Sequence, residues 1–170
     1  MLSLRGQRER DYSAAQEQFV LEHVVGESCL DLGCGRGLIL SKLAARGMNV
    51  LGVDPEPQTA NIPMRPKPIE DCALNDNSWD SVISLHSLEH IPDRRSAVSV
   101  MLRIARKRVI VVVPKSAIGD SPTTPTCIFS RTSGACSTAW VSIPSRSCEK
   151  STWIGASTLT SNSISRSMSK

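Results

Sequence analysis

Three glycines at alternate positions, directly after a short apolar run, are the clearest chemical feature of the sequence. They are Gly33, Gly35 and Gly37 in the stretch CLDLGCGRG at residues 29–37, and Asp31 precedes them. Glycine is needed where a backbone turns sharply or where a ligand approaches without a Cβ in the way. The spacing is G-x-G-x-G rather than the dinucleotide fingerprint G-x-G-x-x-G, and the Lys of a phosphate-binding P-loop is absent. By itself, the pattern predicts a tight turn between a strand and a helix, with or without a ligand.

A carboxylate further along the chain gives this turn a chemical partner. Asp54 ends the next apolar stretch, NVLGVD at residues 49–54. It follows the glycines by about 20 residues, where an acidic residue can accept hydrogen bonds from both ribose hydroxyls of a nucleoside. Such a residue serves NAD and other adenosine ligands alike. Because Pro55 follows, Asp54 also fits a turn or a helix cap. Together, the glycines and Asp54 favour a nucleoside site over a bare turn.

The elements that must hold these residues follow from the apolar pattern of residues 13–114. Short apolar stretches without polar alternation are separated by amphipathic segments, which is typical of a parallel sheet covered by helices on both faces. In such sheets, ligands bind at the carboxyl ends of the strands. We expect the first helix to begin with a capping box of Ser13 and Gln16. The expected helices are 13–25, 38–47 and 94–105, and the expected strands are 28–32, 49–54, 79–85 and 108–114, with 67–70 as a short third strand.

Composition divides the chain near residue 114. Residues 1–114 carry 14 Lys/Arg, 14 Asp/Glu, 11 Ser/Thr and 13 Leu, whereas residues 115–170 carry 6 Lys/Arg, 2 Asp/Glu, 23 Ser/Thr and one Leu. Because the second segment has little apolar surface to bury, we expect it to be largely disordered. The net charge of +4 lies in this segment and is scattered along it. We therefore expect no nucleic-acid footprint.

Cysteine usage and hydropathy favour a cytoplasmic protein without a metal site. The six cysteines form no C-x-x-C pair and no His cluster accompanies them, so we expect reduced thiols rather than zinc ligands or disulfides. No stretch approaches the roughly 18 apolar residues of a membrane span. The first residues carry charges where a signal peptide is apolar. These features predict a soluble protein of the cytoplasm with no membrane partner.

Three stretches of the chain resemble class I S-adenosylmethionine-dependent methyltransferases of the methyltransferase type 11-like kind. CLDLGCGRGLILSKLAARGMNVLGVDPEP is similar to the opening of such a domain. NSWDSVISLHSLEHIPD, 77–93, is similar to its fourth strand and the following loop, and MLRIARKRVIVVVP, 101–114, to its next helix and fifth strand. The resemblance covers about residues 20–114. It implies an α/β, Rossmann-like parallel sheet with helices on both faces, and S-adenosylmethionine as the cofactor.

The resemblance also implies a set of cofactor-binding residues. Asp31 and the backbone of the glycine turn would face the methionine part of the cofactor, and Gly37 would allow close packing of the following helix. Asp54 would hold the ribose hydroxyls. An acidic residue after the third strand would meet the adenine, and the residues just after the fourth strand would line the cofactor and acceptor side. The set is Asp31, Gly33, Cys34, Gly35, Gly37, Asp54, Asp71, Cys72, Leu85 and His86, with Glu70 as an alternative to Asp71.

The reaction that the resemblance implies, methyl transfer, needs few catalytic groups from the protein. A methyl group on a sulfonium is electrophilic, so in-line positioning does much of the work. A general base is needed only when the acceptor must lose a proton. His90 in LHSLEHIPD is one candidate, because histidine titrates near neutral pH. The alternative is that Glu89 and His90 organise the loop and cap the next helix. No catalytic residue is assigned from the sequence.

The family domain continues after its fifth strand with a helix and an antiparallel pair, which residues 115–170 do not show. The sequence therefore divides into a cofactor-binding core, 1–114, and a Ser/Thr-rich tail, 115–170, with the C-terminal strands missing or irregular. One explanation is a serine-rich regulatory tail. Another is a shift of the reading frame near Pro114, since the codons of PTTPTCIF permit a His-rich stretch in a second frame. A frame-shifted tail would leave an open sheet edge and an unstable or inactive chain.

Three functions stay open at this point. The first is a methyltransferase that acts on an unidentified acceptor, either a small molecule or a protein. The second is a nicotinamide-dependent oxidoreductase, against which the glycine spacing argues. The third is a non-catalytic binding module with a degenerate methyltransferase fold.

Overall fold

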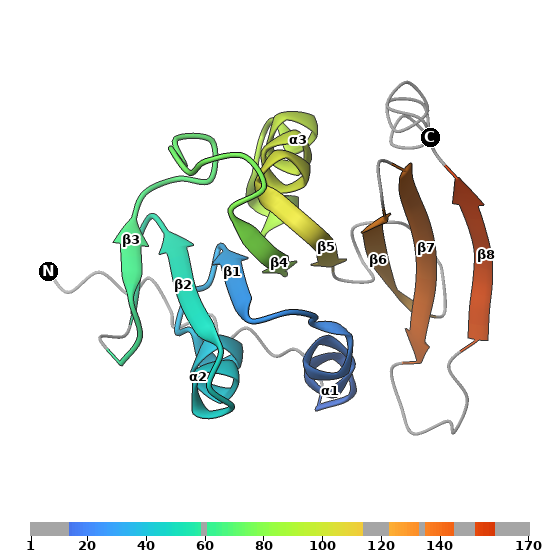
Figure 1. The fold of residues 1–170 in the computed structure, drawn as a ribbon, viewed down its shortest axis with the longest axis horizontal. Helices are drawn as coiled ribbons and strands as arrows, with labels where there is room; N and C mark the ends of the chain where they lie inside the picture. The colour runs from blue at the N-terminus through green and yellow to red at the C-terminus, as the bar shows by residue number, and fades with distance from the viewer. Residues whose placement is uncertain (1–13, 59–60, 114–122, 133–134, 145–151, 159–170) are drawn as a thin grey trace, which may run out of the picture.

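The computed structural model describes residues 14–58, 61–113, 123–132, 135–144 and 152–158 (Figure 1). The helices are α1 (Ala14–His23), α2 (Leu38–Ala45) and α3 (Arg94–Ile104), with a 3-10 turn η1 (Leu88–His90). The strands are β1 (Ser28–Leu32), β2 (Asn49–Asp54), β3 (Met64–Pro66), β4 (Trp79–Leu85), β5 (Ala105–Val112), β6 (Thr123–Thr132), β7 (Ala135–Pro144) and β8 (Thr152–Thr158).

The described strands form one sheet with the order β3-β2-β1-β4-β5-β6-β7-β8. The strands from β1 to β5 run parallel, with β1 paired to β2 on one side and to β4 on the other. The chain reverses its direction of winding at β1, so a crevice is expected outside the carboxyl ends of β1 and β4. The residues that directly follow β1, β2 and β4 lie at this end of the sheet.

Helices cover both faces of the parallel strands, with α1 and α2 on one face and α3 on the other (Figure 1). Successive strand residues alternate between the two faces. Cys29 and Ile83 pack against α1 and α2, while Leu30 and Val82 pack against α3. Each Leu or Ile buried in this way stabilises the fold by about 2 kcal/mol relative to the exposed side chain. These two cores fix the strands that carry the site.

The predicted α/β fold with a parallel sheet is confirmed, and three predicted strands, 28–32, 49–54 and 79–85, have the bounds of β1, β2 and β4. The predicted third strand at 67–70 is wrong, because β3 lies at Met64–Pro66 and pairs there with the end of β2. Residues 68–72 form turns instead, in which the N–H of Asp71 donates to the carbonyl of Pro68. The predicted capping box cannot be checked, since Ser13 lies outside the described residues.

The segment 115–170 differs from the expectation of a largely disordered tail where the structure describes it. β6, β7 and β8 pair antiparallel in sequence, and β6 pairs with β5 over Arg108–Val112. The expected open edge at β5 is therefore covered. The reason is physical: an edge strand offers a row of unpaired N–H and C=O groups, and Thr favours extended backbone. A boundary near residue 114 and a shifted reading frame stay predictions.

A network at the amino ends of the strands ties β4 to the segment before β1. Asp80 Oδ2 accepts a hydrogen bond from the N–H of Glu27 at 2.9 Å. Its other oxygen lies 3.2 Å from both the Arg106 guanidinium and the Lys107 ammonium. Burial by itself raises the pKa of Asp80, but the Glu27 N–H and the two cations outweigh it and lower that pKa below its ordinary value.

In the described part of the chain, no helix is long and apolar enough to cross a membrane. Within that same part, Cys29, Cys34 and Cys72 are buried free thiols.

Candidate functional site

The glycine turn between β1 and α2 is built on left-handed backbone. Gly33, Gly35 and Gly37 have φ of 84°, 51° and 64°, a region that side chains with a Cβ rarely adopt. The Gly33 N–H donates to the carbonyl of Val53 at 2.7 Å, and the Gly37 N–H donates to the carbonyl of Cys34 at 2.8 Å. The glycines therefore let the chain leave β1, touch the end of β2 and enter α2 within a few residues.

Asp54 at the end of β2 is joined directly to this turn. Its Oδ2 accepts a hydrogen bond from the N–H of Gly35 at 2.7 Å, and its Oδ1 accepts one from the N–H of Glu56 at 2.9 Å. The side chain is buried, with Asp54 only 6% exposed. Each carboxylate oxygen has two lone pairs, so both oxygens have further capacity for hydroxyl donors. Asp54 therefore both forms a turn around Pro55 and contacts the glycine turn.

A second buried aspartate lies at the end of β1, beside the glycines. Asp31 is 5% exposed. Burial and then the carboxylate of Asp31 raise the pKa of the Cys29 thiol. A carboxylate at this position suits a cationic ligand group such as an ammonium, and it repels the pyrophosphate that a dinucleotide turn receives. The charge at the turn therefore favours a ligand that places a cationic ammonium there over one that places a pyrophosphate there, as NAD does.

The floor of the turn is packed tightly against β2 and the segment before β3. A Cβ added at Gly52 would lie 2.5 Å from the Sγ of Cys34, and one at Gly37 would lie 2.5 Å from the Cδ1 of Ile62. Real Cβ atoms essentially never come so close. The side chain of Cys34 thus points at β2, so the ligand side of the turn is its backbone.

The loop after β4 lies against the glycine turn. Leu85 is buried in the core on the side of α1 and α2. His86 has a φ of 49°, which is uncommon for a residue other than glycine, and its N–H donates to the carbonyl of Val112 at 2.8 Å. The hydroxyl of Ser87 lies 3.0 Å from the carbonyl oxygen of Gly33. The loop is therefore tied both to β5 and to the glycine turn.

The 3-10 turn η1 brings two imidazoles to one carboxylate. Glu89 Oε1 lies 4.0 Å from His86 Nδ1 and 3.7 Å from His90 Nε2. Glu89 is largely buried, while the side chain of His90 is 59% exposed. The expectation that Glu89 and His90 cap the next helix is wrong. Asp93 caps α3, because its Oδ1 accepts a hydrogen bond from the N–H of Ser96 at 3.0 Å.

Comparison with known proteins finds a family that matches this part of the sequence. Residues 30–113 match the family described as methyltransferase domain. The chain is 33% identical over 89 residues to the ubiquinone biosynthesis O-methyltransferase of Acinetobacter baylyi, covering 44% of this chain and 37% of the relative. It is 32% identical over 94 residues to the protein of the same description from Alkalilimnicola ehrlichii, covering 48% and 38%. The chain thus spans less than two-fifths of the length of these curated relatives.

Solved structures show the same fold. The 1,6-didemethyltoxoflavin-N1-methyltransferase of Burkholderia thailandensis, solved with S-adenosylhomocysteine, superposes with a TM-score of 0.54 at 20% identity over 66% of this chain and 56% of its own. The geranyl diphosphate C-methyltransferase of Streptomyces coelicolor, also solved with S-adenosylhomocysteine, gives 0.53 at 19% identity over 58% and 45%.

Residues 30–113 are a class I S-adenosylmethionine-dependent methyltransferase segment.

The methyltransferase segment holds most of the predicted site residues at one edge of the sheet. The N–H of Gly33 donates to the carbonyl of Val53 and the N–H of Gly35 donates to Asp54, while Ser87 connects this turn to Leu85 and the loop after β4. These contacts lie at the carboxyl ends of β1, β2 and β4. The ligand roles of these residues are taken up below as proposals.

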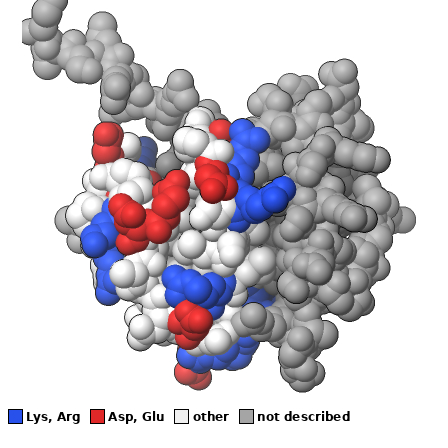
Figure 2. Space-filling model, turned by 90° about the horizontal axis from the view of Figure 1, so that it is seen from above, with Lys and Arg blue, Asp and Glu red and all other residues white. Residues whose placement is uncertain are grey.

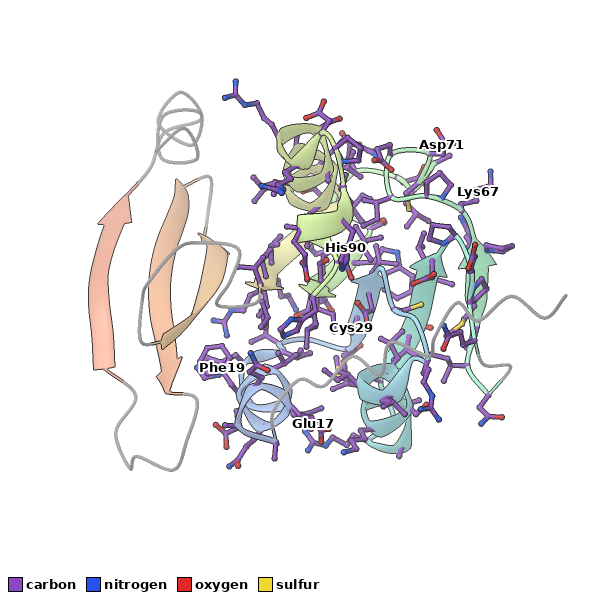
Figure 3. All side chains as sticks on the ribbon, turned by 180° about the vertical axis from the view of Figure 1, so that it is seen from behind. Glu17, Phe19, Cys29, Lys67, Asp71 and His90 are labelled. Atoms are coloured by element: carbon purple, nitrogen blue, oxygen red, sulfur yellow. The ribbon has the colours of Figure 1, made fainter. Side chains whose placement is uncertain are left out.

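The hydrogen bonds that connect the glycine turn, Asp54 and Ser87 do not include Asp71 and Cys72, the two predicted site residues after β3. Asp71 is exposed on the loop after β3, and Figure 3 shows it near Lys67 and away from His90. Cys72 is buried in the core on the side of α3. Burial raises the pKa of the Cys72 thiol, although Arg65, Arg103 and Lys67 oppose that rise. The Cys72 side chain therefore serves packing.

Ser87 is the residue of this site that the sequence did not single out. A serine between His86 and Leu88 has no spacing that distinguishes it from any other loop serine. Its contact with Gly33 joins residues 54 positions apart, which only the fold brings together.

Charges of both signs lie side by side on the described part of the face in Figure 2, where acidic and basic groups alternate with uncharged ones. The expectation of no nucleic-acid footprint stays a prediction.

Proposed function

We propose that this chain transfers a methyl group from S-adenosylmethionine to an acceptor. The observation that carries this proposal is the 2.7 Å hydrogen bond between the Gly35 N–H and the buried carboxylate of Asp54. This bond joins a glycine turn after β1 to an acidic residue after β2, which is the pairing that a nucleoside site requires. The family match over residues 30–113 supports the same function.

The residues at the turn fit the chemical groups of this cofactor. The oxygens of Asp54 have lone pairs for the two ribose hydroxyls. The buried carboxyl group of Asp31 fits the α-ammonium of the methionine part. The left-handed glycines let the backbone come close without side chains in the way. When bound, the cofactor supplies an electrophilic methyl group on a sulfonium. The protein's task is then to hold the donor and the acceptor in line.

A hydroxyl oxygen is the acceptor that the comparisons favour. The curated relatives from Acinetobacter baylyi and Alkalilimnicola ehrlichii are named as O-methyltransferases. A hydroxyl acceptor must lose its proton, and the imidazoles of His86 and His90 lie beside Glu89 on the loop after β4. The proposed setting is the cytoplasm, where the thiols of Cys29, Cys34 and Cys72 would stay reduced.

Calorimetric titration tests the proposal. Wild-type protein is expected to bind S-adenosylhomocysteine and not NADH. Asp54→Ala should weaken S-adenosylhomocysteine binding by at least about tenfold, the loss expected when charge-assisted hydrogen bonds to a ligand are removed. Asp76→Ala is the matched control, because Asp76 is exposed and pairs with Arg103 away from the turn. Unfolding curves of all three proteins show whether the fold is retained.

A non-catalytic binding module is the second candidate, because the family match ends at residue 113 and does not extend over the Ser/Thr-rich residues 115–170. A folded protein that binds neither ligand would support this reading. NADH binding without S-adenosylhomocysteine binding would support an oxidoreductase instead.

A further inference from the structure

Ser87 joins the glycine turn after β1 to the loop after β4 with one side chain. Its Oγ lies 3.0 Å from the carbonyl oxygen of Gly33 on the glycine turn and 3.0 Å from the carbonyl oxygen of Leu85 on its own loop. The residue is 6% exposed. A serine hydroxyl carries one proton, so it donates to one of these carbonyls at a time or is shared between them.

The contact between Ser87 and Gly33 lies at the end of the sheet where a ligand is expected to bind. β1 and β4 are neighbours at the point where the sheet changes its direction of winding, and ligands bind outside the carboxyl ends of such strands. The bonded carbonyl belongs to Gly33, whose peptide leads into the backbone that we assign to the methionine part of the cofactor. A change in the orientation of this peptide would move the glycine turn itself.

Other contacts hold the Ser87 backbone in place. The N–H of His86 donates to the carbonyl of Val112 at 2.8 Å, and the N–H of His90 donates to the carbonyl of Ser87 at 3.0 Å. The positive φ of His86 turns the chain sharply just before Ser87. Because the loop is anchored to β5 and to η1, the Ser87 hydroxyl acts from a fixed position on the more permissive glycine backbone.

We propose that Ser87 is a positioning residue of the cofactor pocket, which sets the Gly33 peptide for the methionine part of S-adenosylmethionine. The inference rests on the proposed function. It predicts that loss of the hydroxyl weakens ligands that reach the glycine turn and spares ligands that stop at the ribose.

Calorimetry with two ligands tests this inference. S-adenosylhomocysteine carries the amino-acid part, whereas methylthioadenosine lacks it. In Ser87→Ala, the Kd for S-adenosylhomocysteine should rise about fivefold, the loss of one ordinary hydrogen bond. The Kd for methylthioadenosine should change by less than about twofold. Ser87→Cys keeps a weaker donor and should give an intermediate Kd. It is also the second variant if the alanine variant does not fold.

Ser81→Ala is the matched control. Ser81 lies in β4, the strand that leads to the Ser87 loop, but at its amino end; it is fully buried and donates to the carbonyl of Val25 at 2.8 Å. It should lower the unfolding temperature about as much as Ser87→Ala and leave both Kd values unchanged.

Three results separate the possibilities. An unchanged Kd for S-adenosylhomocysteine in Ser87→Ala overturns the inference, and so does an equal rise for both ligands, since that indicates a merely structural role. Failure of the wild type to bind either ligand overturns the proposed function on which the inference rests.

Discussion

Two buried aspartates at opposite ends of the parallel sheet have different surroundings. Asp80 lies at the amino end of β4 and contacts the guanidinium of Arg106 and the ammonium of Lys107. Asp54 lies at the carboxyl end of β2 and accepts hydrogen bonds from the backbone N–H groups of Gly35 and Glu56. The first carboxylate is neutralised by cations of the protein, whereas the second shapes a turn.

The contrast separates a stabilising role from a binding role. A carboxylate matched by cations has its charge satisfied in the folded chain, so its value lies in stability. The carboxylate of Asp54 accepts backbone N–H groups, and because each carboxylate oxygen has two lone pairs, it suits the hydroxyl groups of a ligand. Burial alone does not distinguish the two, since Asp54 and Asp80 are 6% and 4% exposed. The partners do.

Asp80→Asn is expected to give the largest loss of stability. The amide keeps the volume but places an NH₂ group and no charge beside Arg106 and Lys107. Both cations have side chains about half exposed, at 52% and 50%, so water takes over part of their solvation. We expect the free energy of unfolding to fall by about 2 kcal/mol, measured by urea unfolding.

The binding of S-adenosylhomocysteine to the folded Asp80→Asn protein should match that of the wild type. A weakened affinity at equal saturation with folded protein would mean that the two ends of the sheet are energetically coupled, and the distinction between the two aspartates would fail.

The stabilisation from Asp80 should depend on pH in one direction. The folded-state pKa of Asp80 is lowered from its ordinary value of 3.8, so its stabilisation is fully present above that value. It is lost as the pH falls below 3.8 and through the folded-state pKa. The difference in unfolding free energy between wild type and Asp80→Asn should be constant near about pH 7 and shrink toward about pH 3. A difference that stays constant over this range would show that the charge of Asp80 is not what stabilises the fold.

The sequence predicted the parallel half of the fold well because its strands are short, largely apolar runs, and β1 and β2 are followed directly by Gly33 and Pro55. β1, β2 and β4 have the predicted bounds. β3 was misplaced, because Met64–Pro66 has no apolar periodicity and is set by pairing with β2. The strands β6–β8 were missed for a related reason: their composition predicts disorder, and their pairing starts from the edge of β5. Whether this segment is read in the natural frame is a question for the nucleotide sequence.

The candidate site was predictable where spacing carries information. Gly35 and Asp54 were predicted from their positions after two strands, and the structure joins them by a hydrogen bond. Ser87 was not, because its contact depends on how close the turn after β1 comes to the loop after β4. The alternative that Glu89 and His90 cap α3 was wrong, because Asp93 caps this helix and the residues LEH form the short turn η1, which the sequence LEHIPD did not reveal.

Asp93→Ala gives the smallest expected effect and tests whether location alone makes a residue functional. Asp93 lies just beyond η1, so it belongs to the same end of the molecule as Asp54. Its carboxylate caps α3 through the N–H of Ser96 at 3.0 Å. Removing an N-cap costs about 1 kcal/mol, so the free energy of unfolding should fall by about that amount in urea. The Kd for S-adenosylhomocysteine should not change, because Val98, Met101 and Ile104 of α3 stay buried against the sheet and hold the helix in place. If binding weakened as much as in Asp54→Ala, then position near the crevice, and not contact with the ligand, would govern binding at this end of the sheet.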